Sequence, residues 1–138
     1  MKITRIVAAM SLALLAQLAI LPARAQTALS QDNDSISVTT ALTFQSIALA
    51  DNGRVMLEMQ NNNANTDNCW VNVDGRVPVG ATTTSTVTNS KGVSVTAAQA
   101  SILLTPGLPY TRYFPHAPSA AIVGTCASVG DSLYVGIH

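Results

Sequence analysis

After an apolar amino-terminal segment, apolar and polar residues alternate in short runs with the two-residue period of β-strands. The longest alternation, over residues 36–44, predicts one half-buried strand. Residues 47–50 predict a second extended segment, and the Asn52-Gly53 pair that follows predicts a hairpin turn, because both residues tolerate positive φ. Residues 55–60 predict a strand with apolar side chains on both faces near its start, which indicates a central position in a sheet.

An asparagine-rich segment at residues 61–68 comes next and precedes a predicted strand over residues 69–73. Asparagine side chains bond to nearby backbone groups and so favour turns over sheet ladders. We therefore interpret the segment as a loop rather than a site. The two strands that it joins hold the only tryptophan, Trp70, and one of the two cysteines.

The remaining segments are shorter. Pro78 restricts residues 76–79 to a sheet edge or a strand end, and residues 80–91 predict a long loop or a solvent-facing edge strand. Further segments are a short strand at 93–95, one helical turn at 97–100, strands at 102–104, 120–126 and 133–137, and turns at 106–109 and 130–131.

These segments amount to seven to nine short strands separated by turn signals, without a convincing helix. We expect an all-β fold: a single-domain antiparallel β-sandwich over residues 36–138, with a small β-barrel as the alternative. Composition supports this expectation. Helices usually carry Glu and Lys on their wet faces, and beyond residue 25 the chain has one residue of each type.

The amino-terminal end has the layout of a secretory signal peptide. Lys2 and Arg5 precede an apolar run over residues 6–21, and the small-residue site Ala23-Arg24-Ala25 follows. A membrane anchor is the alternative, but the run is shorter than the roughly 20 residues that span a bilayer. We expect cleavage after Ala25, a flexible lead-in at residues 26–35, no later membrane span, and export to the periplasm, cell surface or extracellular space.

Cleavage would also change the charge of the chain. The full sequence has a formal net charge of zero, and residues 26–138 have four basic residues against seven acidic ones, a net charge of −3. A mildly acidic domain with sparse charge is a poor binder of nucleic acid. We expect no nucleic-acid partner.

Cys69 and Cys126 are the only cysteines, and an even number in an exported chain predicts a disulfide. The bridge would tie a middle strand to the penultimate one. A link between the two sheets is the more natural interpretation, and a link between neighbouring strands of one sheet stays open.

Three short patterns carry a resemblance to known proteins. They are Arg54-x-x-Leu57-x-x-Gln60-Asn61 after the Asn-Gly pair, Leu104-Thr105-Pro106-Gly107 after an apolar strand, and the closing Leu133-Tyr134-Val135. In this order they resemble small β-sandwich modules of bacterial surface and phage-related virion proteins. The resemblance implies a non-catalytic structural or attachment role. The signal peptide and the cysteine pair depart from a virion part assembled in the cytoplasm and favour the cell surface or periplasm.

Residues for catalysis are few. A hydrolytic triad needs a base, and the chain has only His116, in an aromatic segment, and His138, its last residue. Glu58 is the sole glutamate, which argues against a paired-carboxylate glycosidase. Metal-ligand spacings and phosphate-binding glycine motifs are absent, and Asp32-Asn33-Asp34 is interpreted as a solvated tether rather than a calcium site. We expect no enzymatic activity, no metal and no cofactor; a small hydrolase is the least favoured function.

Two surfaces stay as binding candidates. An aromatic platform for a glycan or a peptide could form from Trp70, Tyr110, Arg112, Tyr113, Phe114 and His116. In the alternative, Trp70 packs over the Cys69 bridge and the tyrosines cover the edge of the sandwich. The second candidate is strand addition between copies of the chain, or with another surface protein, through exposed strand edges. The lead-in and the alternating strand at residues 36–44 could add to a neighbour's edge in this way; in the alternative, that strand pairs within its own domain.

The leading functional hypothesis is therefore an exported, non-catalytic β-sandwich that acts as a structural or adhesive surface component and associates with itself. The second hypothesis is a soluble carbohydrate- or peptide-binding module that uses the aromatic segment from Tyr110 to His116.

Overall fold

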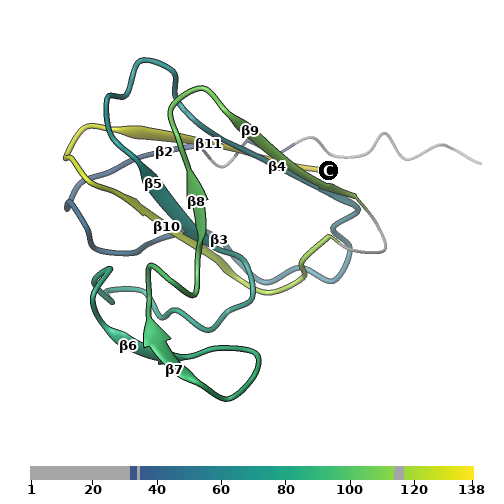
Figure 1. Cartoon of the computed structure of the whole chain (residues 1–138). Helices are drawn as coiled ribbons and strands as arrows, with labels where there is room; N and C mark the ends of the chain where they lie inside the picture. Colours follow the sequence, from purple (N-terminus) through teal and green to yellow (C-terminus); the bar gives the residue numbers. More distant parts are fainter. Residues whose placement is uncertain (1–31, 34, 114–116) are drawn as a thin grey trace, which may run out of the picture.

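The computed structural model describes residues 32–33, 35–113 and 117–138 of the chain (Figure 1). The expected signal peptide at residues 1–25 lies outside these residues. The candidate site residues Phe114 and His116 also lie outside them. Within them the chain forms eleven strands, arranged as two antiparallel sheets and one two-stranded hairpin, with no helix. The sandwich expected from the sequence is confirmed. The strand count exceeds the predicted seven to nine, partly because two strands are only two residues long.

The first sheet has the order β1-β11-β4-β9, and β2 also pairs with β11. Its strands are β1 (Asp32–Asn33), β2 (Ile36–Ser37), β4 (Met56–Asn61), β9 (Pro109–Tyr113) and β11 (Ser132–Ile137). The predicted central position of residues 55–60 is confirmed, because β4 lies between β11 and β9. Asp32 and Asn33, which fall in the predicted lead-in, pair with Ile137 and Gly136.

The second sheet has the order β3-β10-β5-β8. Its strands are β3 (Gln45–Ala48), β5 (Cys69–Asn72), β8 (Ile102–Leu104) and β10 (Ile122–Cys126). The remaining two strands, β6 (Thr86–Thr88) and β7 (Ser94–Thr96), form the separate hairpin, which lies at one end of the molecule (Figure 1).

Two clusters of buried side chains hold these layers together. The main core lies between the two sheets and includes Leu57 and Met59 from β4, Val71 from β5, and Leu133 and Val135 from β11, all fully buried. Burial of one such side chain stabilises the fold by roughly 1.5–3 kcal/mol. The outer cluster packs on the opposite face of the second sheet and consists of Phe44, Val77, Ala97 and Val123, with the half-buried Trp70 and Val87 against it.

The connections β3–β4, β4–β5, β8–β9 and β10–β11 each run from one sheet to the other. The hairpin predicted at Asn52-Gly53 is therefore wrong. A turn is present, closed by a 2.8 Å hydrogen bond from the Gly53 N–H to Asp51 Oδ1, and neither Asn52 nor Gly53 has a positive φ. The turn places β3 and β4 in different sheets, where their apolar side chains face each other across the main core.

The single strand predicted over residues 36–44 is also wrong. Strand β2 ends at Ser37, and the chain then turns through Leu42, which has a φ of 58° and an exposed side chain. Val38 is buried in the main core, whereas Phe44 is buried in the outer cluster. The alternation of apolar and polar residues over 36–44 therefore covers two segments that belong to different sheets. The turn between these segments happens to keep the two-residue spacing of the apolar positions.

Most other local predictions agree with the structure. The turns at 106–109 and 130–131 are present, with Gly107 and Gly130 at positive φ, and the Ala100 N–H donates to the Thr96 carbonyl in the predicted single helical turn. Residues 76–79 form no strand, although Val77 is buried. None of the described residues belongs to a helix with the length and apolar character needed to cross a membrane.

Candidate functional site

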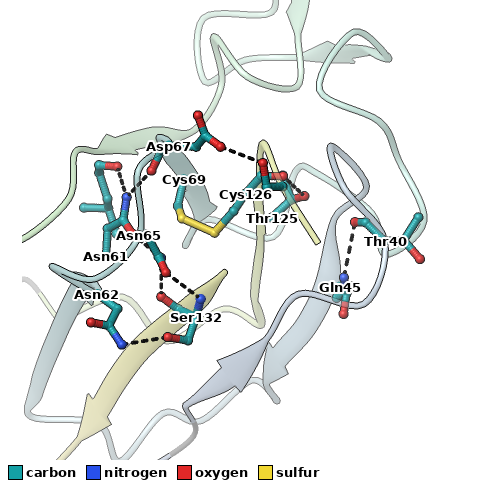
Figure 2. Close-up of a disulfide and its surroundings, with 12 residues drawn as sticks. Thr40, Gln45, Asn61, Asn62, Asn65, Asp67, Cys69, Thr125, Cys126 and Ser132 are labelled. Atoms are coloured by element: carbon teal, nitrogen blue, oxygen red, sulfur yellow. Dashed lines mark hydrogen bonds between the residues drawn. A yellow bond between two sulfur atoms is a disulfide. The ribbon is translucent and has the colours of Figure 1, made fainter. Parts of the chain in front are cut away.

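The predicted disulfide between Cys69 and Cys126 is present (Figure 2). Its strands, β5 and β10, are neighbours in the second sheet, and the two residues are register partners. The expected link between the two sheets is therefore wrong, and the alternative within one sheet is correct. Since each strand contributes one buried cysteine to the main core, the bridge is fully enclosed. A disulfide is compatible with an oxidising, exported location.

The described part of the chain has no cluster of residues that could bind a metal ion, apart from one group at the disulfide. The one group of three ligand-bearing residues there is Cys69, Cys126 and Asp131. Both cysteine sulfurs are in the disulfide and provide no thiolate, which leaves Asp131 as a single carboxylate. This group is a structural element rather than a metal centre.

The predicted aromatic platform is divided between the two sheets. Trp70, on β5, packs in the outer cluster, on the face of the second sheet opposite to its neighbour Cys69. It therefore does not cover the disulfide, contrary to the alternative interpretation. Tyr110, on β9 of the first sheet, packs against the main core instead. The structure does not bring Trp70 and Tyr110 together, and Phe114 and His116 lie outside the described residues.

Residues 110–113, expected as part of an aromatic loop, form strand β9 at the edge of the first sheet. Arg112 Nε donates a 2.6 Å hydrogen bond to the Tyr110 hydroxyl, and its guanidinium lies 5.3 Å from the centre of that ring. The hydrogen bond raises the pKa of the already basic Arg112. Tyr113 is 63% exposed. Three of the candidate residues thus lie on one edge strand, where they are partly open to solvent.

The backbone of β9 has a definite open side. His138 and Met56 exchange backbone hydrogen bonds, so the even-numbered residues of β4 bond to β11 and the odd-numbered ones to β9. Leu57 and Met59 pair with Arg112 and Tyr110. The N–H groups of the alternate residues, Thr111 and Tyr113, consequently point away from the sheet, and none of the described strands pairs with that side.

Apolar side chains accompany this open edge. Strand β8 is the edge of the second sheet on the same side of the sandwich, and a turn at residues 105–108 joins it to β9 (Figure 1). Leu103 on β8 is 52% exposed, and Leu108 in the turn is 63% exposed. We call β8, β9 and this turn the β8–β9 edge. It combines backbone groups that none of the described strands pairs with and exposed apolar side chains, the two features that promote strand addition.

A second surface feature was missed by sequence reasoning. A groove of about 430 Å³ lies on the outer face of the first sheet, at the end of β4 and the beginning of β11. Its lining residues are Ser35, Gln60, Asn62, Asn63, Ser132, Leu133 and Tyr134. Two of them, Asn62 and Asn63, come from the asparagine-rich segment that was interpreted as a loop alone. The surplus of asparagines was the available signal, but their position relative to β11 is non-local.

Hydrogen bonds hold the wall of this groove. Asn65 Nδ2 donates to the Ser132 carbonyl at 2.9 Å, Asn65 Oδ1 accepts from the Ser132 N–H at 3.2 Å, and Asn62 Nδ2 donates to Ser132 Oγ at 2.9 Å. The fully buried Asn61 donates to the carbonyls of Asp67 and Leu104 and accepts from Asn65 Nδ2 (Figure 2). These bonds connect the loop to both sheets. We call Asn61, Asn62, Asn65 and Ser132 the amide network.

Comparisons with known proteins give no relative. The chain matches no family model, no curated protein and no solved structure. The resemblance to surface and virion β-sandwich modules therefore stays a prediction.

Proposed function

We propose that this protein is an exported, non-catalytic β-sandwich that acts as a structural or adhesive surface component and associates with itself through the β8–β9 edge. The observation that carries the proposal is the open side of β9. There, the N–H groups of Thr111 and Tyr113 point away from the sheet and pair with none of the described strands, and the turn that leads into β9 exposes Leu108.

An edge strand of this kind is a template for a strand from another molecule. Added strands gain main-chain hydrogen bonds, and exposed apolar side chains beside the edge add buried area on contact. Pro109, at the start of β9, has no N–H, so the hydrogen bonds of an added strand would centre on Thr111 and Tyr113. The opposite side of β9 is fixed by five register pairs with β4, which gives the template a defined position.

Export is supported by the amino-terminal sequence and by the disulfide. The basic, apolar and small-residue sections of residues 1–25 have the order of a secretory signal peptide. The Cys69–Cys126 bridge would persist in the periplasm or outside the cell but not in a reducing compartment. A surface or periplasmic location is consistent with both features.

Self-association is tested by size-exclusion chromatography with light scattering on the exported protein over a wide range of concentration. We expect the mean mass to rise with concentration. The Thr111→Pro variant removes an outward N–H and should lower that mass towards the monomer. Leu108→Lys should do the same by placing charge on the edge.

Leu49→Lys is the matched control, because Leu49 is 82% exposed and follows β3, at the opposite edge of the second sheet. It should associate as the unmodified protein does. A monomer at all concentrations, or equal association in Leu108→Lys and the unmodified chain, would remove the self-association proposal.

A further inference from the structure

The groove on the outer face of the first sheet has a lining without any charged side chain. Its six polar lining residues carry amides or hydroxyl groups, and the seventh, Leu133, has its side chain buried in the main core. A site for an anion such as phosphate or carboxylate normally includes Arg or Lys. An uncharged lining of amides, hydroxyls and one phenol suits a neutral ligand with many hydroxyl groups.

Several of these polar groups are available to a ligand. The side chain of Asn63 makes no hydrogen bond with the described residues, and neither does the Tyr134 hydroxyl. Gln60 donates through Nε2 to the Gly107 carbonyl at 2.8 Å, which fixes the amide while its Oε1 accepts no bond from the described residues. An amide offers both donors and acceptors, so it can bond two adjacent hydroxyl groups of one ligand.

The ring of Tyr134 gives the groove an aromatic surface. Tyr134 and Gly136 lie on the same face of β11, two residues apart. A methyl group at Gly136 would come within 2.7 Å of the Tyr134 hydroxyl oxygen, so the ring extends from the groove along β11 and its hydroxyl end lies over Gly136, which is not a lining residue. Aromatic rings placed on a flat sheet face can stack on the apolar face of a sugar ring.

The polar wall is also rigid before any ligand arrives. Ser132 is held by four hydrogen bonds to Asn62 and Asn65, from its backbone and its hydroxyl. Preorganised groups lose little conformational entropy on binding, and this favours affinity for a weakly interacting, hydrated ligand. The volume of about 430 Å³ lies in the usual range for small-molecule sites.

We propose that this groove is a binding site for a neutral saccharide, with Tyr134 as the stacking surface and Asn63 and Gln60 as the hydroxyl-recognising groups. None of its lining residues belongs to the β8–β9 edge, although the Gly107 carbonyl in the turn of that edge accepts the hydrogen bond from Gln60. The proposal adds a ligand class to the proposed surface role and does not depend on self-association.

The test uses the full chain, expressed with its own amino-terminal segment and purified after export. The probes are cellotetraose, maltotetraose, mannotetraose and chitotetraose, with tetragalacturonate as an acidic counterpart. Saturation-transfer NMR detects contact, and titration calorimetry gives the affinity. We expect at least one neutral tetrasaccharide to bind and tetragalacturonate to bind less tightly or not at all.

Variants then locate the site. Tyr134→Ala should weaken binding roughly tenfold through loss of the stacking surface. Tyr134→Phe and Asn63→Ala, which preserve the ring and the fold, should each weaken it by a factor of about two to ten through loss of one hydrogen bond. Tyr113→Ala, which removes an exposed tyrosine from β9, is the control and should bind as the unmodified chain does.

The proposal is overturned if no neutral tetrasaccharide binds, if tetragalacturonate binds most tightly, or if Tyr134→Ala and Asn63→Ala both retain full affinity. A monomeric chain that binds a neutral saccharide would support the groove and reject self-association. An associating chain that binds none would do the reverse.

Discussion

Cys69 and Cys126 lie directly opposite each other in neighbouring strands of one sheet, with 3.9 Å between their Cα atoms. Next to them the Ala127 N–H donates to the Asn68 carbonyl at 3.1 Å, which identifies the cysteines as a non-hydrogen-bonded pair, the closer of the two pair types in an antiparallel ladder. The bridge therefore fixes the register of β5 against β10. It does not link the two sheets, which are held together by the apolar side chains of the main core.

The disulfide should stabilise the fold mainly by closing a loop in the unfolded chain, which lowers the conformational entropy of the unfolded state. The separation of 57 residues corresponds to roughly 4 kcal/mol in the chain-entropy model. Urea unfolding of the Cys69→Ala/Cys126→Ala double variant should give a free energy of unfolding lower by about that amount. The intact protein should have a mass two hydrogens below that of the reduced chain, and two free thiols in the exported protein would contradict the bridge.

Removal of the buried Asn61 amide should be costly. In Asn61→Ala the carbonyls of Leu104 and Asp67 lose a donor and Asn65 loses an acceptor, so we expect a loss of about 2–4 kcal/mol in urea unfolding. Asn63→Ala is the matched control and should change stability by less than about 0.5 kcal/mol. Equal stability of the two variants would show that the amide network contributes nothing.

The isosteric change Asn61→Asp adds a pH dependence to the same site. A carboxylate there would face two carbonyl oxygens in a buried position, so its charged form is disfavoured and the pKa of the new carboxyl in the folded state is raised. A group with a raised folded-state pKa stabilises the fold at low pH and loses this effect as the pH rises. Thermal unfolding should therefore show N61D approaching the unmodified chain in acid and falling below it at neutral pH.

Arg54 should be more important for stability than its charge suggests. It is 3% exposed, and its guanidinium donates to the backbone carbonyls of Leu49, Pro118 and Ala120, thereby joining the turn before β4 to the segment before β10. Arg54→Lys keeps the charge but loses the planar fork, and we expect a loss of roughly 2–3 kcal/mol. Arg76→Lys, at an exposed ion pair with Asp74, should cost less than about 1 kcal/mol in the same assay.

A methyl group at Gly124 on β10 should crowd the main core. A Cβ at this position would lie 2.6 Å from Ile47 Cδ1 and 3.0 Å from Leu133 Cδ1, both in the main core. Gly124→Ala should therefore lower the free energy of unfolding by about 1–3 kcal/mol through overpacking. Gly53→Ala, at an exposed turn without positive φ, is the control and should leave stability unchanged within about 1 kcal/mol. A neutral Gly124→Ala would mean that the ends of the Ile47 and Leu133 side chains move aside to accept the methyl group.

The positions of turns were largely predictable, whereas the partners of the strands were not. Asn52-Gly53 and Gly130-Asp131 mark changes of direction correctly, because turn chemistry acts within a few residues. Whether the next strand pairs beside the previous one or crosses to the other sheet depends on where both bury their apolar faces. That choice is non-local, and it made the predicted hairpin at Asn52-Gly53 wrong.

The composition of the candidate site was also not predictable from local sequence patterns. Trp70 and Tyr110 share an aromatic character that sequence alone could group, yet one packs outside the second sheet and the other at the edge of the first. Conversely, Asn62 and Ser132 are 70 residues apart in sequence and form one wall of the groove. No local pattern relates these positions.

An all-β chain, most of its turn positions and the pairing of its two cysteines could be predicted from the sequence, because strand period, turn chemistry and a single cysteine pair are local or countable properties. Tertiary structure alone decided that the disulfide lies within one sheet, that β9 is an open edge, and that the asparagine-rich loop lines a groove with β11. These features follow from the burial of apolar faces against distant segments, and that energy depends on all the strands at once.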